Sequence, residues 1–315
     1  MRFFWLFTAA VLATGAPAAA SPRVELPAAK RLLPSSGAAA CETTECLIEQ
    51  AYARDPKAAE LALALYRGTG DVAGVGPAEL MDGGFRGPIQ LVPQLPVAAY
   101  RKHLGWVVAG AEAMDHFFAQ LFPPGQAEPR YRWRALEFRF VRSLVKHRPS
   151  AYALGWAVEY NVEGSLNTSQ RGVSETLFHE LFHVNDQDHG DWSASHLRAD
   201  YQRISSRCGS PPNTRCLTPY APNDTMVRGG TYYAFQQNNG DTVHEYAAEL
   251  AVRYFKEQRE MLEQGKLARP AFKCGPAENA RAWQATVAEF FAGRDLVPPC
   301  PVATRSPSGS APRAR

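Results

Sequence analysis

The segment ETLFHELFHVND, residues 175–186, places His179, Glu180 and His183 inside an otherwise apolar run. Apolar residues recur there at helical spacing, so we expect an amphipathic helix over about residues 172–186. Its expected core stripe consists of Val173, Leu177, Leu181 and Val184. Titratable groups are costly to bury unless they find partners. The fold must therefore provide a polar site against this helix.

The spacing of the two histidines indicates a metal site. A helix returns to nearly the same face every four residues, so His179 and His183 project side by side and can bind one ion. Glu180 is rotated away from this pair and can reach a water molecule without being a ligand. This is the H-E-x-x-H pattern of zinc sites. We predict one zinc ion, with the histidines as ligands and Glu180 as the general base.

A catalytic zinc site needs a third protein ligand and an open position for water. One candidate is Glu245 in DTVHEYAAELAVRYF, on a helix expected over residues 242–263. Glu249 follows four residues later and would lie on the same helix face. A mostly buried helix with two carboxylates on one side fits a metal site, whereas a solvated acidic face is the alternative.

The second candidate for the third ligand is His189. HELFHVNDQDH matches H-E-x-x-H-x-x-G-x-x-H except that Asp186 replaces the glycine. In the full pattern, that glycine allows the chain to turn sharply so that the third histidine returns to the metal. This arrangement also requires a downstream methionine turn, for which Met226 is available.

FHELFHVND followed by EYAAELAVRYF resembles the zinc peptidase family of anthrax lethal factor and the related secreted proline-specific endopeptidases. The resemblance covers only the part of the chain around these two helices. It implies that Glu245 is the third ligand, that Glu249 orients a ligand histidine, and that Asp186 matches the family's aspartate after the second histidine. The family's tyrosine, which stabilises the oxyanion, would be Tyr233, with Tyr232 as the alternative.

The expected fold is therefore α+β and zincin-like, with a small mixed sheet, the H-E-x-x-H helix, a C-terminal glutamate-bearing helix and a helical region before them. The expected activity is that of a zinc metalloendopeptidase acting on a protein or peptide through a zinc-activated water. Residues 153–163 are the candidate strand for binding extended substrate. A secreted binding or inhibitory module on the same fold is the alternative, although a purely structural metal would not need Glu180.

Periodicity gives a coarse map of the remaining elements. Residues 134–163 show partial period-two alternation and are predicted to form strands. Stretches rich in Gly, Pro or Asn predict loops at residues 70–97 and 206–242. Further helices are expected over residues 56–67, with Asp55 as N-cap and Gly68 after the end, and over residues 98–122, 193–205 and 280–291.

The N-terminus predicts export. An apolar stretch after Arg2 ends in the small-residue sequence Ala18-Ala19-Ala20, typical of a signal peptide cleaved after residue 20. The expected organisation is a signal peptide at 1–20, a flexible lead-in at 21–40, a helical N-terminal region at 41–130, a catalytic region at 131–300 and a disordered tail at 301–315. The protein would be secreted or periplasmic.

Export makes disulfides the expected state of the six cysteines. Nearness in sequence favours the pairs Cys41–Cys46, Cys208–Cys216 and Cys274–Cys300. A cysteine zinc site is the competing interpretation, but no C-x-x-C pair occurs.

Composition limits the partners. The formal net charge of +3 is small for 315 residues and gives no reason to expect nucleic acid. No run of apolar residues in the mature chain is long enough for a membrane span. We expect a monomer.

Overall fold

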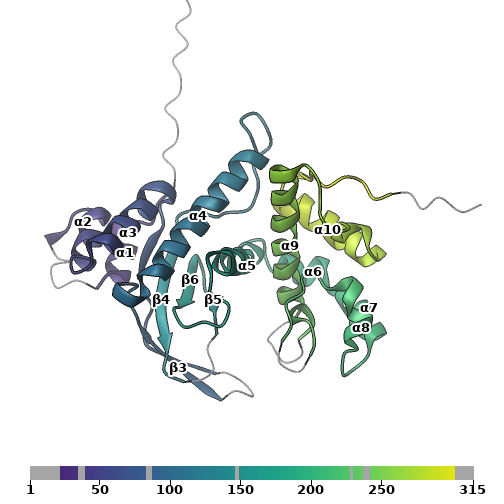
Figure 1. Ribbon diagram of the computed structural model, residues 1–315, viewed down its shortest axis with the longest axis horizontal. Coiled ribbons are helices and arrows are strands. Elements are labelled where there is room, and N and C mark those ends of the chain that lie inside the picture. The colour runs from purple at the N-terminus through teal and green to yellow at the C-terminus, as the bar shows by residue number, and fades with distance from the viewer. Residues whose placement is uncertain are drawn as a thin grey trace, which may run out of the picture.

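The computed structural model describes residues 22–34, 40–82, 87–145, 149–227, 230–236 and 242–301. Over these residues the chain has a mixed α+β fold, with the sheet in its N-terminal half and only helices in its C-terminal part (Figure 1). The α-helices are α1 (Leu26–Leu32), α2 (Thr44–Ala51), α3 (Pro56–Thr69), α4 (Arg101–Leu121), α5 (Gln170–Asp188), α6 (Trp192–His196), α7 (Arg198–Cys208), α8 (Thr214–Leu217), α9 (Thr242–Gln264) and α10 (Ala277–Phe290). Short 3-10 helices are η3 (Ala98–Tyr100), η4 (Thr218–Tyr220), η5 (Tyr233–Phe235) and η6 (Phe272–Cys274).

Strands from the predicted N-terminal region (41–130) and from the predicted catalytic region (131–300) form one mixed sheet. They are β1 (Val72–Val75), β2 (Glu79–Asp82), β3 (Pro88–Pro93), β4 (Glu137–Ser143), β5 (Ala151–Ala153) and β6 (Ala157–Asn161). The strand order is β2-β3-β4-β6-β5, and β1 also pairs with β4. β1 runs parallel to the first half of β4, whereas β3 runs antiparallel to its second half. β6 is parallel to β4, and β5 forms an antiparallel edge.

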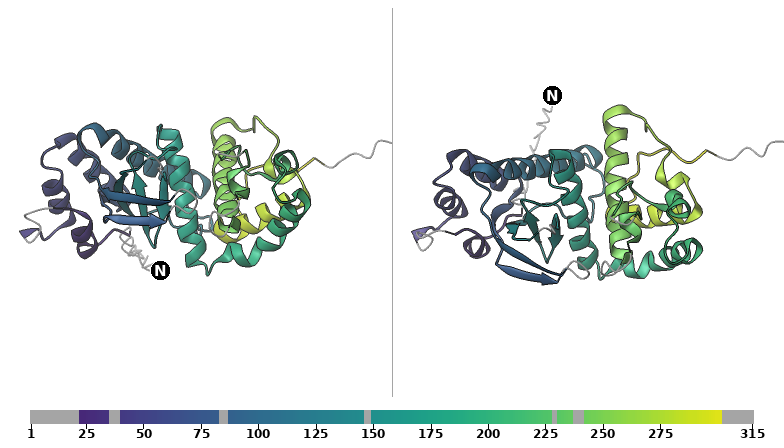
Figure 2. Two further views of the ribbon diagram at one scale, coloured as in Figure 1. Left: turned by 90° about the horizontal axis from the view of Figure 1, so that it is seen from below. Right: turned by 60° about the horizontal axis from the view of Figure 1, so that its bottom comes forward.

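One face of the sheet packs against helices. Alternate residues of β4 and β6 enter the main core: Phe138, Phe140, Val158 and Tyr160. The apolar faces of α4 and α5 complete this core. Figure 2 shows α4 along the sheet and α5 between the sheet and α9. The predicted core stripe of the histidine-bearing helix is confirmed, because all four of its apolar residues are buried.

Helices α5 and α9 pack against each other and cross at a steep angle, since Figure 1 shows α5 nearly end-on and α9 lengthwise. Glu175, early in α5, pairs with Lys256 late in α9, whereas His179 meets Glu249, nearer the start of α9. Ser169 caps α5 by accepting a hydrogen bond from the Gly172 amide, as serine does at helix starts.

Other helix ends follow local signals with small differences. Asp55 caps α3 by accepting from the Ala58 amide, as predicted. The helix ends at Gly70, whose φ of +75° suits glycine, rather than at Gly68. The helix expected over residues 193–205 is two helices, α6 and α7.

Three segments predicted as irregular contain regular structure. The loop expected over residues 206–242 holds the end of α7 together with α8, η4 and η5. Residues 70–97 were predicted to be a loop, and this is wrong, because they form β1, β2 and β3. These strands are short and pair mainly with distant residues, so local composition does not reveal them. The lead-in expected at residues 21–40 contains α1, and Leu32 and Leu33 are buried.

The strand proposed for substrate is also placed differently. Within residues 153–163, β6 lies between β4 and β5 and cannot accept a further strand. Among the described strands, β5 is the edge on this side of the sheet. The predicted signal peptide at 1–20 and nearly all of the predicted tail lie outside the described residues.

All three predicted disulfides are present: Cys41–Cys46, Cys208–Cys216 and Cys274–Cys300. The first two close short loops, whereas the third attaches the segment after α10 to η6. Among the described residues, no helix combines the length and apolarity needed to cross a bilayer.

The second face of the sheet holds a buried carboxyl group. Tyr152 on β5 donates a hydrogen bond to Glu79 on β2, so the two ends of the strand order meet over this face. Glu159 lies beneath them, 2% exposed, and accepts one hydrogen bond from Arg139. Its Oε2 has no hydrogen-bond partner in the described part of the chain. A Cβ on Gly76 would lie 2.1 Å from that oxygen and 2.7 Å from Val141 Cγ1, so a larger residue there would have to displace both side chains.

Glu159→Gln should reduce the pH dependence of stability. Burial raises the pKa of Glu159 to about 7, although Arg139 opposes this, whereas an unfolded glutamate titrates near about 4.3. Between these values the native state keeps a proton that the unfolded chain loses, so stability falls as pH rises. Between about pH 5 and about pH 7 the variant should lose less stability than the wild type, by about 2 kcal/mol. Urea unfolding at several pH values measures this, and equal slopes would contradict it.

Candidate metal centre

Helix α5 presents two imidazoles at one point. His179 and His183 lie one helical turn apart, and their Nε2 atoms are 3.1 Å apart. His179 is buried, whereas His183 is half-buried. The site is therefore built into a packed helix, and His183 is the more exposed of the two histidines.

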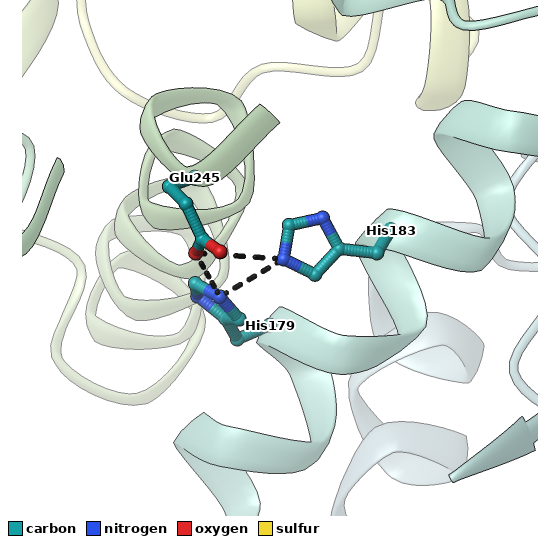
Figure 3. A group of neighbouring side chains, drawn as sticks. All are labelled: His179, His183 and Glu245. Atoms are coloured by element: carbon teal, nitrogen blue, oxygen red, sulfur yellow. Dashed lines mark hydrogen bonds and ion pairs between the residues drawn. The ribbon is translucent and has the colours of Figure 1, made fainter. Parts of the chain in front are cut away.

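Glu245, in the first turn of α9, completes the group. Its Oε2 lies 3.1 Å from His179 Nε2 and 3.6 Å from His183 Nε2 (Figure 3). All three side chains offer ligand atoms within 4.8 Å of one another. These residues could hold a metal ion, as the sequence predicted for the histidines and for Glu245.

The spacing of the three ligand atoms fits a tetrahedral ion. Ligands about 2.05 Å from zinc, at tetrahedral angles, are about 3.3 Å from each other. The separations of 3.1, 3.1 and 3.6 Å agree with this. Two imidazole nitrogens and one carboxylate oxygen are also a donor set that zinc accepts.

Glu249 lies on the far side of His179. Its Oε1 is 3.3 Å from His179 Nδ1, and its side chain is largely buried. A hydrogen bond from Nδ1 to this carboxylate leaves the Nε2 lone pair directed at the metal position. Glu249 therefore lies where it can orient a ligand, which is the role that the resemblance implies.

The electrostatics of the group favour a cation. Burial lowers the pKa of His179, but hydrogen bonds with Glu245 and Glu249 outweigh it and raise that pKa well above its ordinary value. Burial raises the pKa of Glu245, but hydrogen bonds with both histidines lower it well below its ordinary value. Both shifts arise because carboxylates stabilise positive charge at this point, and a divalent cation would benefit from the same interaction.

Glu180 lies beside the group without belonging to it. The residue is 8% exposed, and burial raises the pKa of its carboxyl, against the charges of His179 and His183. A carboxylate with a raised pKa accepts a proton more readily than an ordinary glutamate.

Of the two candidate tyrosines, Tyr233 is next to His179. Its ring centroid lies 5.7 Å from that of His179. The hydroxyl of buried Tyr232 instead donates a hydrogen bond to Thr218 Oγ1 at 3.1 Å. The structure thus brings Tyr233, and not Tyr232, beside the ligand histidine.

The carboxylate of Asp186 accepts hydrogen bonds from the following helix, α6. It is 1% exposed, and its oxygens accept hydrogen bonds from the Ser193 amide at 2.7 Å and hydroxyl at 2.6 Å. His244 Nε2 lies 3.8 Å from the same carboxylate. Asp186 therefore fixes the start of α6 beside α5 and lies close to the residue that precedes Glu245.

His189 does not join the ligand pair. With aspartate instead of glycine at position 186, α5 continues to Asp188 and carries His189 past the metal position. The ring nitrogens of His189 lie 2.7 Å from Glu289 Oε1 and 3.2 Å from the Arg130 carbonyl oxygen. Met226, the candidate for the methionine turn, is 49% exposed.

Two polar residues near the centre were not anticipated from the sequence. Ser193 holds Asp186, and Asn223 donates a hydrogen bond to the backbone of Glu249. Each contact joins segments that are separate in sequence, and neither residue stands in a local pattern that would reveal it.

Comparison with known proteins gives no family for this chain: no protein-family model, no curated protein and no solved structure matches it significantly.

Substitution of a ligand should remove the metal. We expect the purified protein to hold about one divalent ion per chain, and His179→Ala, His183→Ala and Glu245→Ala to lose it. His189→Ala is the matched control and should keep the ion, because its ring contacts Glu289 and Arg130 instead. Elemental analysis after gel filtration measures this. An ion retained by all three ligand variants would disprove the ligand set.

Glu249→Gln should weaken metal binding without abolishing it. Loss of the carboxylate next to His179 Nδ1 removes the group that orients this ligand, which typically lowers affinity about 10- to 100-fold. Competition with a chelator of known affinity measures the change, and an unaltered affinity would show that Glu249 does not orient His179.

Proposed function

We propose that this protein is a secreted zinc-dependent metallopeptidase that hydrolyses internal peptide bonds. The observation that carries the proposal is a buried carboxylate, Glu180, beside three side chains that could hold a metal: His179, His183 and Glu245. A site that only stabilised the fold would not need a base at that position.

Zinc is the metal we propose, because two imidazoles and one carboxylate leave one tetrahedral position open. When bound, zinc supplies Lewis acidity, which polarises a carbonyl group and brings the pKa of a water molecule towards about 7. His179, His183 and Glu245 would hold the ion, and Glu249 would keep His179 in the right tautomer.

Glu180 acts as the general base in this proposal. Its position one residue after His179 directs the carboxyl beside the metal ligands rather than at them. Its pKa is raised by burial, which suits a group that takes a proton from water and later gives it to the leaving amine.

Tyr233 would stabilise the negative charge that develops on the substrate oxygen. Its ring lies beside His179, and a phenol hydroxyl is a suitable donor to an oxyanion. The resemblance noted in the sequence gives a tyrosine this role, and the position of the ring supports the assignment.

The edge strand β5 offers a place for extended substrate. It pairs with β6 on one side and contacts α5. A peptide added to its other edge would run close to the helix that carries the histidines, with main-chain hydrogen bonds as the main source of affinity.

Secretion is proposed from the sequence and the disulfides. The first 20 residues have the pattern of a signal peptide, and all six cysteines form disulfides, which persist in oxidising compartments. A binding module that retains the metal is the second candidate function, and the test below separates it from the enzyme.

Glu180→Gln should abolish hydrolysis while zinc remains. The substitution keeps the size of the side chain and removes the base, which is worth about 10²- to 10⁴-fold in rate. Cleavage of a peptide library by wild type and variant, read by mass spectrometry, measures the effect. Zinc content and melting temperature should barely change.

Tyr233→Phe is the graded control. It should slow turnover by about 10²-fold through loss of a donor and leave zinc in place. A Glu180→Gln variant that cleaves as fast as wild type would rule out Glu180 as the base. If the zinc-loaded wild type cleaves no peptide, the binding module is the better account.

A further inference from the structure

The segment that carries Tyr233 is attached to α9 in two ways: η5 packs on the helix, with the rings of Phe235 and Tyr246 5.6 Å apart, and a buried amide before η5 donates to the helix backbone. Asn223 is 5% exposed, and its Nδ2 donates a 2.7 Å hydrogen bond to the backbone oxygen of Glu249. Its Oδ1 has no hydrogen-bond partner among the described residues. The hydrogen bond from Nδ2 is therefore the one that this side-chain amide makes within the described residues.

A second set of contacts joins Asn223 to Tyr233. The Tyr233 amide donates to the Thr225 carbonyl at 2.8 Å. Met226 forms an isolated bridge with Tyr232, and the Val227 amide donates to the Thr231 carbonyl at 2.9 Å. Residues 225–227 are thus paired with residues 231–233, and Asn223 lies just before this pairing.

The Asn223 contact and the His179 contact meet at one residue of α9. The residue that accepts from Asn223 is Glu249, whose side chain lies 3.3 Å from His179 Nδ1. The ring centroid of Tyr233 lies 5.7 Å from that of His179. One turn of α9 therefore fixes the ligand histidine through a side chain and the tyrosine-bearing segment through a carbonyl group.

We propose that Asn223 is a positioning residue for Tyr233. By attaching the paired segment that carries Tyr233 to the turn of α9 that contains Glu249, it sets the distance between the Tyr233 phenol and the residues that would hold the metal. This inference rests on the proposed function, because it concerns the residue that would stabilise the oxyanion. Misplacement of a catalytic group by about 1 Å can cost about 10²-fold in rate, so such an anchor has a measurable effect.

An asparagine suits this position for a definite reason. The Glu249 carbonyl lies within α9, where it already accepts a helical hydrogen bond, and it has a second lone pair available. A buried donor is needed to use it. Alanine removes the donor and leaves the helical bond intact, so Asn223→Ala should loosen the segment rather than the helix.

The first measurement does not depend on activity. Hydrogen–deuterium exchange of peptides covering residues 221–227 and 230–236 should be about tenfold faster in Asn223→Ala than in wild type. Exchange in peptides from α5 and the metal content should be unchanged. Unaltered exchange in the tyrosine-bearing segment would overturn the inference, whatever the activity of the protein.

The second measurement uses a double-mutant cycle. In Asn223→Ala, kcat should fall about tenfold or more with little change in KM. In the Tyr233→Phe background the same substitution should cause no further fall, because the hydroxyl that it positions is already gone. A general loss of stability would instead lower both backgrounds equally, and equal losses would overturn the inference.

Asn279→Ala is the matched control. Asn279 is also a buried asparagine whose Nδ2 donates to backbone carbonyls, those of Pro219 and Phe272, and whose Oδ1 has no partner in the described part of the chain. It should lower the melting temperature similarly without changing kcat. If Asn223→Ala does not fold, Asn223→Ser replaces it, since the shorter hydroxyl cannot reach the Glu249 carbonyl. If wild type cleaves nothing, the proposed function fails and the exchange measurement alone decides whether Asn223 fixes the segment.

Discussion

The contact between α5 and α9 decides where the rest of the site lies. His179 is held between two carboxylates of α9, Glu245 at Nε2 and Glu249 at Nδ1. Next to this polar contact the interface is apolar, and the rings of Phe178 and Phe255 stack with centroids 4.5 Å apart. Polar groups inside such an interface must satisfy one another, so a shift of one helix along the other would leave buried charges without partners. The register of the two helices is therefore set by the same atoms that could hold a metal.

Much of the site could be predicted because its signals are local. Two histidines four residues apart on an amphipathic helix specify a face and a spacing without knowledge of the fold. The assignment of Glu245 as a ligand depended on the family resemblance as well, since a helix with two carboxylates is also compatible with a solvated face. The choice against His189 depends on whether the chain turns after Asp186. Aspartate lets α5 continue to Asp188, where glycine would favour a turn.

The parts that were missed depend on contacts between distant residues. β1 and β2 are four residues long and contain glycine, alanine and acidic residues, which are poor strand formers by themselves. They form strands because β4 and β3 offer edges to pair with. The contact of Asn223 could not be predicted either, because an asparagine in a segment rich in proline and asparagine is typical of a turn. Its partner, the backbone of Glu249, has no signature in the sequence.

The parallel pairing of β1 with β4 has a consequence for the way this polypeptide can be divided. A fragment starting at residue 131 would keep Glu180 and the three residues that could hold a metal, but it would lack β1, β3 and the whole of α4. β4 would then present an unpaired edge, and Phe138 and Phe140 would lose part of their apolar cover. Such an edge is a template for aggregation. The residues before position 131 are therefore part of the same sheet and core as the histidine-bearing helix, and their removal would expose both a strand edge and apolar side chains.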